Sequence, residues 1–450
     1  MVANLPPRIK AFPIVGALPQ AIMNFPKLIS DAAKQGDIVR IPFGSSDMYL
    51  VSHPDYLQQI MRDNHKKYAR GGDGAKSLER VIGRGLIVLD GQEWLTERRM
   101  MQPFFHRKYF PVLFDTMLAT IDEKLDELEA RVRQTPDAII DMAPVFKNIT
   151  MNVFLRSMFG MSIDDELAHT IGETVDTAMR LSTGRGRFED FLPAWVSLPS
   201  DKVMHACIAK FTQIVEELIA ERSQRTEQPD DLLGFFMSAR DEDTQEGMSH
   251  EQLRDECKTL IIGGYDTTSG TLMWVLDLLH QHPEVVNKLV SEADTVLAQP
   301  LNYERAQALE YTRKVILETL RLRPVSWANN RYCIETDQVG GYDIPANSMV
   351  FFPIMQIQRD PRWWGEDAGV FNPERWNDKD GGAKHRWAFT AFGGGPRVCL
   401  GEQFALLEAT LVLPKLLQRF NVKTLHPEAK EVTYDFTMQP TTLPVRISVR

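Results

Sequence analysis

One of the four cysteines, Cys399, lies in the stretch FGGGPRVCLG at residues 392–401, directly before a strongly apolar helical segment. The N–H groups and positive dipole at the start of that helix favour the thiolate form of a nearby cysteine. Glycine lets a large group approach the main chain, although it costs conformational entropy. The pattern therefore predicts a thiolate beside a bulky bound group.

Three kinds of site compete for this stretch. The stretch does not match a phosphate-binding loop, because GxGxxG would need glycine at position 398, which is Val398, and a Walker loop would need Lys-Ser/Thr after its last glycine. A catalytic nucleophile would want a histidine, which is not close in sequence, although folding could bring one near. An axial haem ligand uses every part, since the thiolate binds iron, the glycines lie against the porphyrin and Arg397 meets a propionate.

The stretch resembles the haem signature of the cytochrome P-450 family, FxxGxRxCxG. Its fixed positions are matched by Phe392, Gly395, Arg397, Cys399 and Gly401. The resemblance extends over nearly the whole chain. It implies that Cys399 ligates the iron of a haem b, iron protoporphyrin IX, and that Phe392, Gly393 and Gly401 lie beside it. No CxxCH occurs, so the haem should be non-covalent.

A second motif, GGYDTT, interrupts the predicted helix 252–281. Two interior glycines cost about 1 kcal/mol each relative to alanine, and such violations of propensity tend to mark function. Gly263, Asp266 and Thr267 should share one helical face that offers a cavity, a carboxyl and a hydroxyl. The alternative is a glycine-packed helix crossing whose threonines bond back to carbonyls. The motif resembles the family's oxygen-binding helix, which implies that Asp266 and Thr267 pass protons during catalysis.

Two arginine motifs complete the resemblance. Glu318-x-x-Arg321 alone would be a surface ion pair, but with PERW downstream it is similar to the family's ExxR and PERF elements. This implies a buried structural network of Glu318, Arg321 and Arg375. Trp94-x-x-x-Arg98 is similar to the WxxxR helix, and the implied haem contacts and propionate partners are Trp94, Arg98, Arg331 and Arg397. Arg331 is equally well explained as a rim residue.

Helical spacing dominates the hydrophobic pattern. It predicts helices over 112–135, 202–224, 252–281 and 400–420. Strand-like alternation is confined to 38–52, 339–353 and 431–450. We expect a mainly α protein with small β-sheets. The resemblance implies the cytochrome P-450 fold, with a helix-rich region, a minor β region and the haem between distal and proximal helices, as a single domain over 1–450 without a fused reductase.

Composition excludes several classes of protein. With 43% apolar and 25% charged residues the chain has a globular balance, and its net charge of −10 argues against nucleic-acid binding. The cysteines form no CxxC pair, which disfavours a disulfide framework or zinc site. No apolar run near the start is long enough for a signal peptide or membrane anchor. We expect a cytoplasmic protein.

The resemblance implies a monooxygenase that puts one oxygen atom of O2 into an unreactive C–H or C=C bond. Electrons would come from a ferredoxin or flavodoxin with its NAD(P)H-dependent reductase. A peroxide-driven peroxygenase of the same fold would typically replace the acid and alcohol that this chain keeps. A haem-binding sensor would need only Cys399.

The substrate and the docking surface follow only from position within the family. The implied pocket residues are Ile87, Ile262, Gly263, Ser326, Trp327, Ala328 and Met438. This largely apolar set suits a lipophilic small molecule such as a fatty acid, terpenoid, steroid or macrolide. An acidic ferredoxin would dock on basic residues of the cysteine side, for which we expect Arg99, Arg107, Lys108, Lys384 and Arg386.

Overall fold

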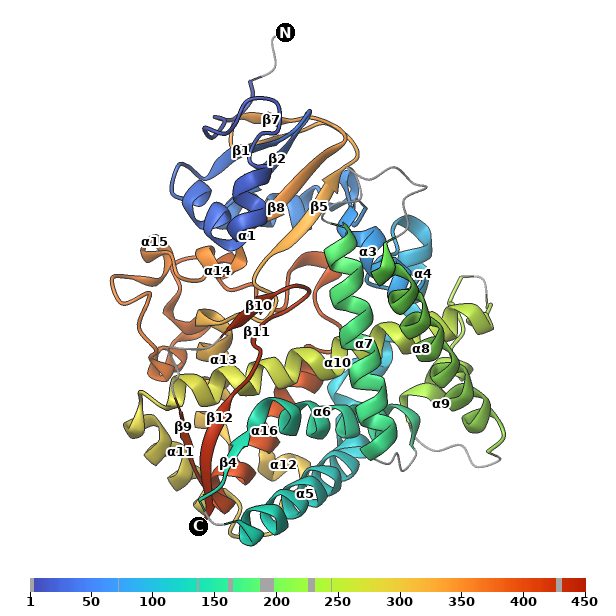
Figure 1. The fold of residues 1–450 in the computed structure, drawn as a ribbon, viewed down its shortest axis with the longest axis vertical. Coiled ribbons are helices and arrows are strands. Elements are labelled where there is room, and N and C mark those ends of the chain that lie inside the picture. The colour runs from blue at the N-terminus through green and yellow to red at the C-terminus, as the bar shows by residue number, and fades with distance from the viewer. Residues whose placement is uncertain are drawn as a thin grey trace. The chain divides into compact units, whose positions relative to one another are not determined.

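The computed structural model of the chain describes residues 4–71, 73–135, 137–160, 165–186, 198–225, 231–243, 245–425 and 431–450. The chain forms two compact units. Unit 1 contains Met1–Gly72 and Leu317–Cys399, and unit 2 contains Asp73–Ile316 and Leu400–Arg450. Helices dominate and the sheets are small (Figure 1), so the predicted mainly α class is confirmed. The single domain over 1–450 stays a prediction.

Unit 1 is built on a five-stranded sheet with the strand order β1-β2-β8-β5-β3. Its strands are β1 (Ile38–Phe43), β2 (Ser46–Val51), β3 (Tyr68–Ala69), β5 (Asn329–Cys333) and β8 (Ser348–Phe352). The β2–β8 pair is parallel and the other pairs are antiparallel. The alternation predicted for 38–52 thus forms the β1–β2 hairpin, and its inward residues Ile41 and Leu50 are buried.

Short elements surround this sheet. Helix α1 (Leu18–Ala33) buries Ile29 and Ala32 in a cluster with Ile41 and Leu50. A second cluster contains Val350, Phe352 and Trp387. The remaining elements of unit 1 are α2 (Pro54–Gln58), η1 (Gln59–Asp63), η2 (His65–Lys67), β6 (Asp337–Val339), β7 (Tyr342–Ile344), α14 (Ile354–Ile357), α15 (Pro361–Trp364), η6 (Pro373–Asn377), η7 (Lys379–Gly382), η8 (Arg386–Ala388) and η9 (Gly395–Arg397).

Unit 2 is mostly helical. Its helices are α3 (Asp73–Ile82), α4 (Gly91–Met101), η3 (Gln102–Phe105), η4 (Arg107–Tyr109), α5 (Phe110–Gln134), α6 (Met142–Phe159), α7 (Asp165–Gly186), α8 (Pro199–Ser223), α9 (Leu232–Ser238), α10 (His250–Leu279), α11 (Pro283–Val296), α12 (Tyr303–Ala306) and α16 (Glu402–Arg419). Helix α13 (Glu310–Leu322) begins in unit 2 and ends in unit 1.

Helix α10 is the central element of unit 2, and Figure 1 shows it as a long helix beside α6 and α16. It begins with a capping box, because the Ser249 hydroxyl accepts from Gln252 N and the Gln252 side chain accepts from Ser249 N. Most of its residues from Leu253 to Leu279 are buried, so its position is fixed by packing on several sides.

Two small sheets lie in unit 2. One has the order β4-β12-β9, from β4 (Ile139–Asp141), β12 (Pro444–Val449) and β9 (Phe420–Thr424). The other pairs β10 (Val432–Tyr434) with β11 (Met438–Pro440). Strand β9 includes Phe420, which the sequence placed at the end of the helix 400–420, whereas α16 ends at Arg419.

The predicted long helices agree with α5, α8, α10 and α16 to within three residues at each end. The alternating segments 339–353 and 431–450 contain β7 and β8, and β10, β11 and β12. Within the described ranges, no helix has both the length and the apolar composition needed to span a bilayer.

Candidate active site

The cysteine loop of unit 1 is a closed turn. Cys399 N donates to Phe392 O at 2.9 Å, and Val398 N donates to Gly395 O at 3.1 Å. The Cys399 residue is exposed, whereas Cys257 and Cys333 are buried and Cys207 is half-buried. The loop therefore holds one accessible thiol on a backbone that is bonded to itself.

The backbone of this loop requires glycine for its own geometry. Gly395 has φ +68°, and a Cβ there would lie 2.0 Å from the carbonyl oxygen of Met61 in η1. At Gly394 a Cβ would lie 2.3 Å from the Trp387 ring. These two glycines are needed because unit 1 packs closely behind the loop. By contrast, a Cβ at Gly401 would meet nothing within 4 Å.

The predicted propionate partners are distributed over both units. Trp94 and Arg98 lie on α4 of unit 2 and are each 9% exposed, and Arg98 Nε donates to Gln102 Oε1 at 3.3 Å. Arg331 on β5 of unit 1 is 4% exposed, and its Nη1 donates to Asn329 Oδ1 and to Asn330 O. Arg397 is half-buried in η9. Their haem contacts stay a prediction.

In the middle of α10, a few residues are partly exposed between buried neighbours. Leu260, Gly263 and Thr267 are half-exposed, and they follow one another at three- and four-residue steps. A Cβ added at Gly263 would meet nothing within 4 Å. The glycine therefore creates open space at this point of the helix, with the Thr267 side chain one turn further on.

The GGYDTT motif also shows the features of a glycine-packed helix crossing whose threonines bond back to carbonyls. The hydroxyl of Thr267 donates to Gly263 O at 2.8 Å, and that of Thr268 donates to Gly264 O at 3.2 Å. A Cβ at Gly264 would lie 2.3 Å from the Phe154 ring of α6. Gly264 thus serves a tight helix crossing, whereas Gly263 opens a space, so the two glycines have different roles.

Asp266 differs from the expectation that it shares the open face. It is only 8% exposed, and its carboxylate accepts from Thr437 Oγ1 and from Gln439 Nε2, both at 2.7 Å. Successive helix residues are turned by about 100°, so neighbours cannot face the same way. The acid therefore points into the protein toward the β11 segment, and the Thr267 residue lies on the open side.

Charges around Asp266 form a buried polar cluster. Burial first, and then the nearby Asp176 carboxylate, raise the pKa of Asp266, whereas Lys147 and the two hydrogen bonds oppose this rise. Lys147 Nζ lies 2.6 Å from Asp176 Oδ2 and 3.9 Å from Asp266 Oδ1. The Tyr265 hydroxyl donates to the same Asp176. The cluster holds an acid whose proton affinity is increased by its surroundings.

The structure brings the ExxR residues of unit 1 together. Glu318 and Arg321 are both 0% exposed, and two hydrogen bonds of 2.8 Å join the guanidinium and the carboxylate. Arg321 also donates to the carbonyls of Gln358, Ala368 and Val370. Arg375 Nε lies 3.6 Å from Glu318 Oε1. This network joins α13 to the segment from 358 to 375.

Sequence reasoning missed the partners of Asp266. Thr437 and Gln439 lie 171 and 173 residues away in the chain, and Lys147 comes from α6. The one available signal was the spacing of Thr437 and Gln439, because residues two apart on an extended segment face the same side. It also missed Glu256, a fully buried carboxyl whose pKa is raised by burial and by the neighbouring Glu97.

The predicted substrate-pocket residues fall into two groups. Four are partly open to solvent: Ile87, Gly263, Ser326 and Ala328. Three are at most 6% exposed: Ile262, Trp327 and Met438. The Trp327 ring lies 6.1 Å from each of the Phe25 and Phe351 rings, within the core of unit 1. The pocket assignment stays a prediction for both groups.

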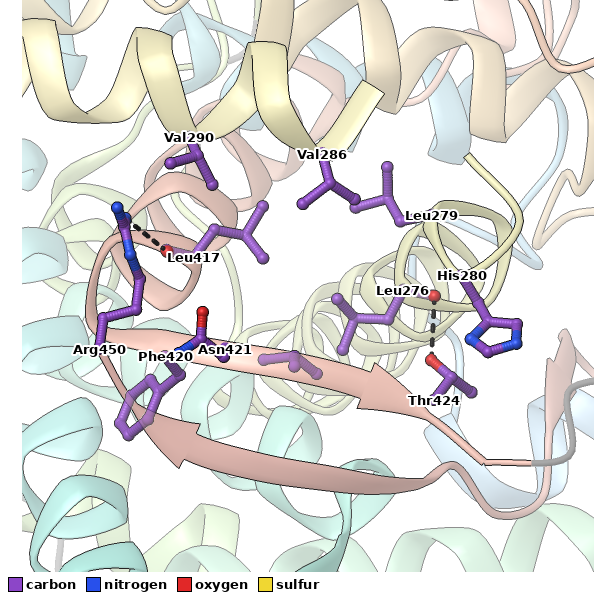
Figure 2. Close-up of a pocket in the computed structure, with 11 residues that line it drawn as sticks. Leu276, Leu279, His280, Val286, Val290, Leu417, Phe420, Asn421, Thr424 and Arg450 are labelled. Atoms are coloured by element: carbon purple, nitrogen blue, oxygen red, sulfur yellow. Dashed lines mark hydrogen bonds between the residues drawn. The ribbon is translucent and has the colours of Figure 1, made fainter. Parts of the chain in front are cut away.

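Figure 2 shows a cavity of about 160 Å³ in unit 2, lined from α10, α11, α16 and β9. It begins at Leu276, nine residues after Thr267 and thus roughly 14 Å further along the helix axis. Polar groups at its edge already have partners, since Arg450 donates to Leu417 O and Thr424 donates to Leu276 O. This cavity contains none of the predicted site residues.

The predicted docking cations have unequal surroundings. Arg99 is paired with Asp241 at 2.9 Å and Asp243 at 2.5 Å, so the prediction that it adds positive charge to a patch is wrong. Lys108 is exposed beside Tyr109. Lys384 and Arg386 are exposed in unit 1. The side chain of Arg107 lies outside the described part of the chain.

Comparisons with known proteins agree with the motifs. Residues 6–448 match the family described as Cytochrome P-450. The chain is 29% identical to a pentalenene oxygenase of Streptomyces avermitilis, over 98% of this chain and 96% of that protein. It is also 29% identical to a cyclooctat-9-en-7-ol 5-monooxygenase of Streptomyces melanosporofaciens, over 88% and 85% of the two chains. An echinocystic acid 23-monooxygenase of Saponaria officinalis is 30% identical over 76% and 69%.

Proposed function

The chain belongs to the cytochrome P-450 family, and from this premise we propose that it oxygenates a lipophilic terpenoid with electrons from a separate redox protein. The general class of activity follows from the family and from the names of the relatives. The protein is a haem-dependent monooxygenase. The outcome is a hydroxylated or epoxidised product, with the second oxygen atom of O2 released as water.

The names of the relatives support a terpenoid over a fatty acid, steroid or macrolide. Pentalenene, cyclooctat-9-en-7-ol and echinocystic acid are the compounds in those names. The half-open positions Ile87, Gly263 and Ala328 carry small or apolar side chains. Such positions suit a hydrocarbon skeleton better than a charged group.

The residues of this chain fit a haem b. Cys399 presents an exposed thiol on a closed loop, and Gly263 keeps open space on α10. Arg98, Arg331 and Arg397 carry forked guanidinium groups that suit two propionates. When bound, the haem supplies the oxygen-activating chemistry, to which the thiolate contributes electron density.

Asp266 and Thr267 are the residues proposed to deliver protons. Asp266 lies in a buried polar cluster that raises its proton affinity, and the next residue, Thr267, is one of the partly exposed residues of α10. The acid would hold the proton, and the hydroxyl would orient water on the open side. Both proposed roles are proton transfers between oxygen atoms, so neither residue has to bind a metal ion.

An acidic ferredoxin or a flavodoxin, reduced by its NAD(P)H-dependent reductase, is the proposed electron source. The exposed Lys384 and Arg386 precede the cysteine loop and favour an acidic partner. Arg99 is left out of this surface because two aspartates balance its charge. The cytoplasmic location stays a prediction.

The observation that carries the proposal is the exposed thiol of Cys399 on its glycine loop. The ferrous carbonyl complex should show the namesake band of the family, and Cys399→His should abolish it while the protein still binds haem. A wild-type protein that is folded and haem-replete but lacks this band would contradict thiolate ligation.

The proposal that the substrate is a terpenoid is tested separately with a panel of terpenoids, fatty acids, steroids and macrolides. We expect terpenoids to perturb the haem spectrum and to be oxygenated when ferredoxin and its reductase are supplied. Turnover with peroxide alone would instead indicate a peroxygenase. Binding without turnover in the presence of competent redox partners would indicate a sensor.

A further inference from the structure

Residues 83–90 form a short loop between α3 and α4, and this loop contains Ile87, one of the proposed pocket residues. Gly85 O accepts from Leu89 N at 3.2 Å, so the loop is a closed turn. Leu86 and Leu89 are 8% and 5% exposed, whereas Ile87 is partly exposed. The turn therefore buries two of its side chains and leaves Ile87 accessible.

A carboxylate of α10 holds the start of this loop. Asp255 is 3% exposed, and its Oδ2 accepts from Arg84 N at 2.7 Å. The approach is close, because a Cβ at Gly83 would lie 2.2 Å from the same Oδ2. Gly83 also has φ +75°, a conformation that favours glycine. Asp255 therefore fixes the point where the chain leaves α3, and glycine is the residue that fits beside it.

A second contact lies one turn further along α10. A Cβ at Gly85 would lie 1.9 Å from Thr259 Oγ1, so the loop backbone rests directly on this hydroxyl. The Thr259 hydroxyl is itself fixed, since it donates to Asp255 O at 2.8 Å. Thr259 precedes Gly263 by four residues, about 6 Å along the helix axis. The turn that carries Ile87 is therefore held close to the open space at Gly263.

The Asp255 carboxylate is divided between the loop and its own helix. Its Oδ1 accepts from Arg254 Nε at 2.8 Å, while its Oδ2 accepts from Arg84 N. Arg254 has a further acidic partner on α10, because Glu251 Oε1 lies 3.2 Å from its Nη2. Removal of the Asp255 carboxylate would therefore release the loop, while Arg254 keeps an ion pair on the helix.

We propose that Asp255 and Thr259 are positioning residues that set where Ile87 stands in the substrate pocket, and thus which substrate shapes the enzyme accepts. This rests on the proposed function, in which Ile87 contacts the substrate. Asp255 acts through the amide of Arg84. Thr259 acts through the backbone of Gly85. Neither residue has to touch the substrate, because a loop fixed to a helix at two points holds its side chains in a defined place.

The first measurement is hydrogen exchange of the intact haem-loaded protein, followed on peptides that cover residues 83–90. Asp255→Ala should make the Arg84 amide exchange about tenfold faster or more, because its bond to a carboxylate is lost. Glu251→Ala is the matched control, since it removes an acid that is 78% exposed and pairs with the same Arg254. It should leave exchange of the loop unchanged. Asp255→Asn keeps an oxygen that can accept from Arg84 N, so it should retain most of the protection.

The second measurement compares imidazole with phenylimidazole by spectral titration of the haem. Both bind iron through a ring nitrogen, but the added phenyl ring makes phenylimidazole sensitive to the pocket wall. Asp255→Ala should weaken phenylimidazole binding about tenfold, because loss of contact with a large aliphatic side chain is worth roughly a decade. Imidazole binding should not change. Gly85→Ala should act in the same direction without altering α10, because its methyl group would meet the Thr259 hydroxyl.

Three results would overturn the proposal. Loop exchange in Asp255→Ala equal to that in Glu251→Ala would mean that the carboxylate does not hold the loop. Faster exchange with an unchanged phenylimidazole constant would mean that the loop does not shape the pocket. An equal loss for both ligands would indicate disturbed haem binding instead. A wild type without the ferrous carbonyl band would contradict the proposed function alone, because exchange of the loop does not depend on thiolate ligation.

Discussion

Glu318→Ala should lower the free energy of unfolding by about 3–5 kcal/mol, because it leaves the Arg321 guanidinium buried without its carboxylate. Both side chains are 0% exposed, so water cannot replace the lost partner. Besides Arg321, Glu318 accepts bonds from Asn372 N and Trp376 Nε1, both at 3.0 Å. The substitution therefore strands a charge and two neutral donors at once.

The size of this effect is limited by the other contacts of Arg321. Its guanidinium keeps three carbonyl acceptors, those of Gln358, Ala368 and Val370, which partly solvate the charge. A loss of about 3–5 kcal/mol is still a large part of the usual 5–15 kcal/mol of stability. Arg321→Met should cost at least as much, since it leaves those carbonyls and the Glu318 carboxylate unpaired.

Urea unfolding followed by tryptophan fluorescence measures this effect directly, because Trp376 donates to Glu318 and the Arg321 guanidinium lies 4.9 Å from the Trp364 ring. Asp31→Ala is the matched control. It removes the acid of an exposed ion pair with Lys27 and should change stability by less than about 1 kcal/mol. If Glu318→Ala and Asp31→Ala have equal effects, the network is not a buried ion pair in solution.

Three further outcomes are expected. Thr267→Ala should keep the haem spectrum but divert electrons to hydrogen peroxide, measured as peroxide released per product formed; unchanged coupling would exclude this hydroxyl from the relay. Burial raises the pKa of Glu256 above its usual 4.5, so its contribution to stability is present below that pH and is lost as pH rises. The urea midpoint of Glu256→Gln should therefore fall less between about pH 5 and pH 8 than that of wild type, and parallel curves would argue against a protonated carboxyl. Charge reversal at Lys384 and Arg386 should slow reduction by an acidic ferredoxin and flatten its salt dependence without unfolding, and equal rates and salt slopes would exclude this docking surface.

The local sequence pattern was sufficient to predict the helix and the loop that carry the motifs. Helix α10 could be predicted because apolar spacing continues through GGYDTT, and the Cys399 loop because a cluster of glycines and the cysteine directly precede an apolar helical run. The pairing of Glu318 with Arg321 also follows locally, since residues three apart on a helix are neighbours. Burial of that pair could not be read from spacing alone, because segment 358–375 encloses it.

Contacts between distant segments account for what the sequence did not reveal. Arg99 looked like a free cation next to Arg98, but Asp241 and Asp243 lie 142 and 144 residues further along the chain. The ring contacts of Trp327 with Phe25 and Phe351 were not predicted either, and its role in the pocket stays a prediction. In each case the partner belongs to an element that local periodicity does not connect with the residue.

The bonds that hold Asp266 and Thr267 bear on how a proton relay could work. The Asp266 carboxylate accepts from Thr437 and Gln439, and the Thr267 hydroxyl donates to Gly263 O, so the hydroxyl has to leave that carbonyl before it can donate to water. A hydrogen bond between neutral groups, such as that from Thr267 to Gly263 O, contributes about 0.5–1.5 kcal/mol net. A turnover of about 10 per second corresponds to a barrier of about 16 kcal/mol. Loss of the Thr267 bond would therefore be a small part of such a barrier, so this bond is compatible with the proposed relay.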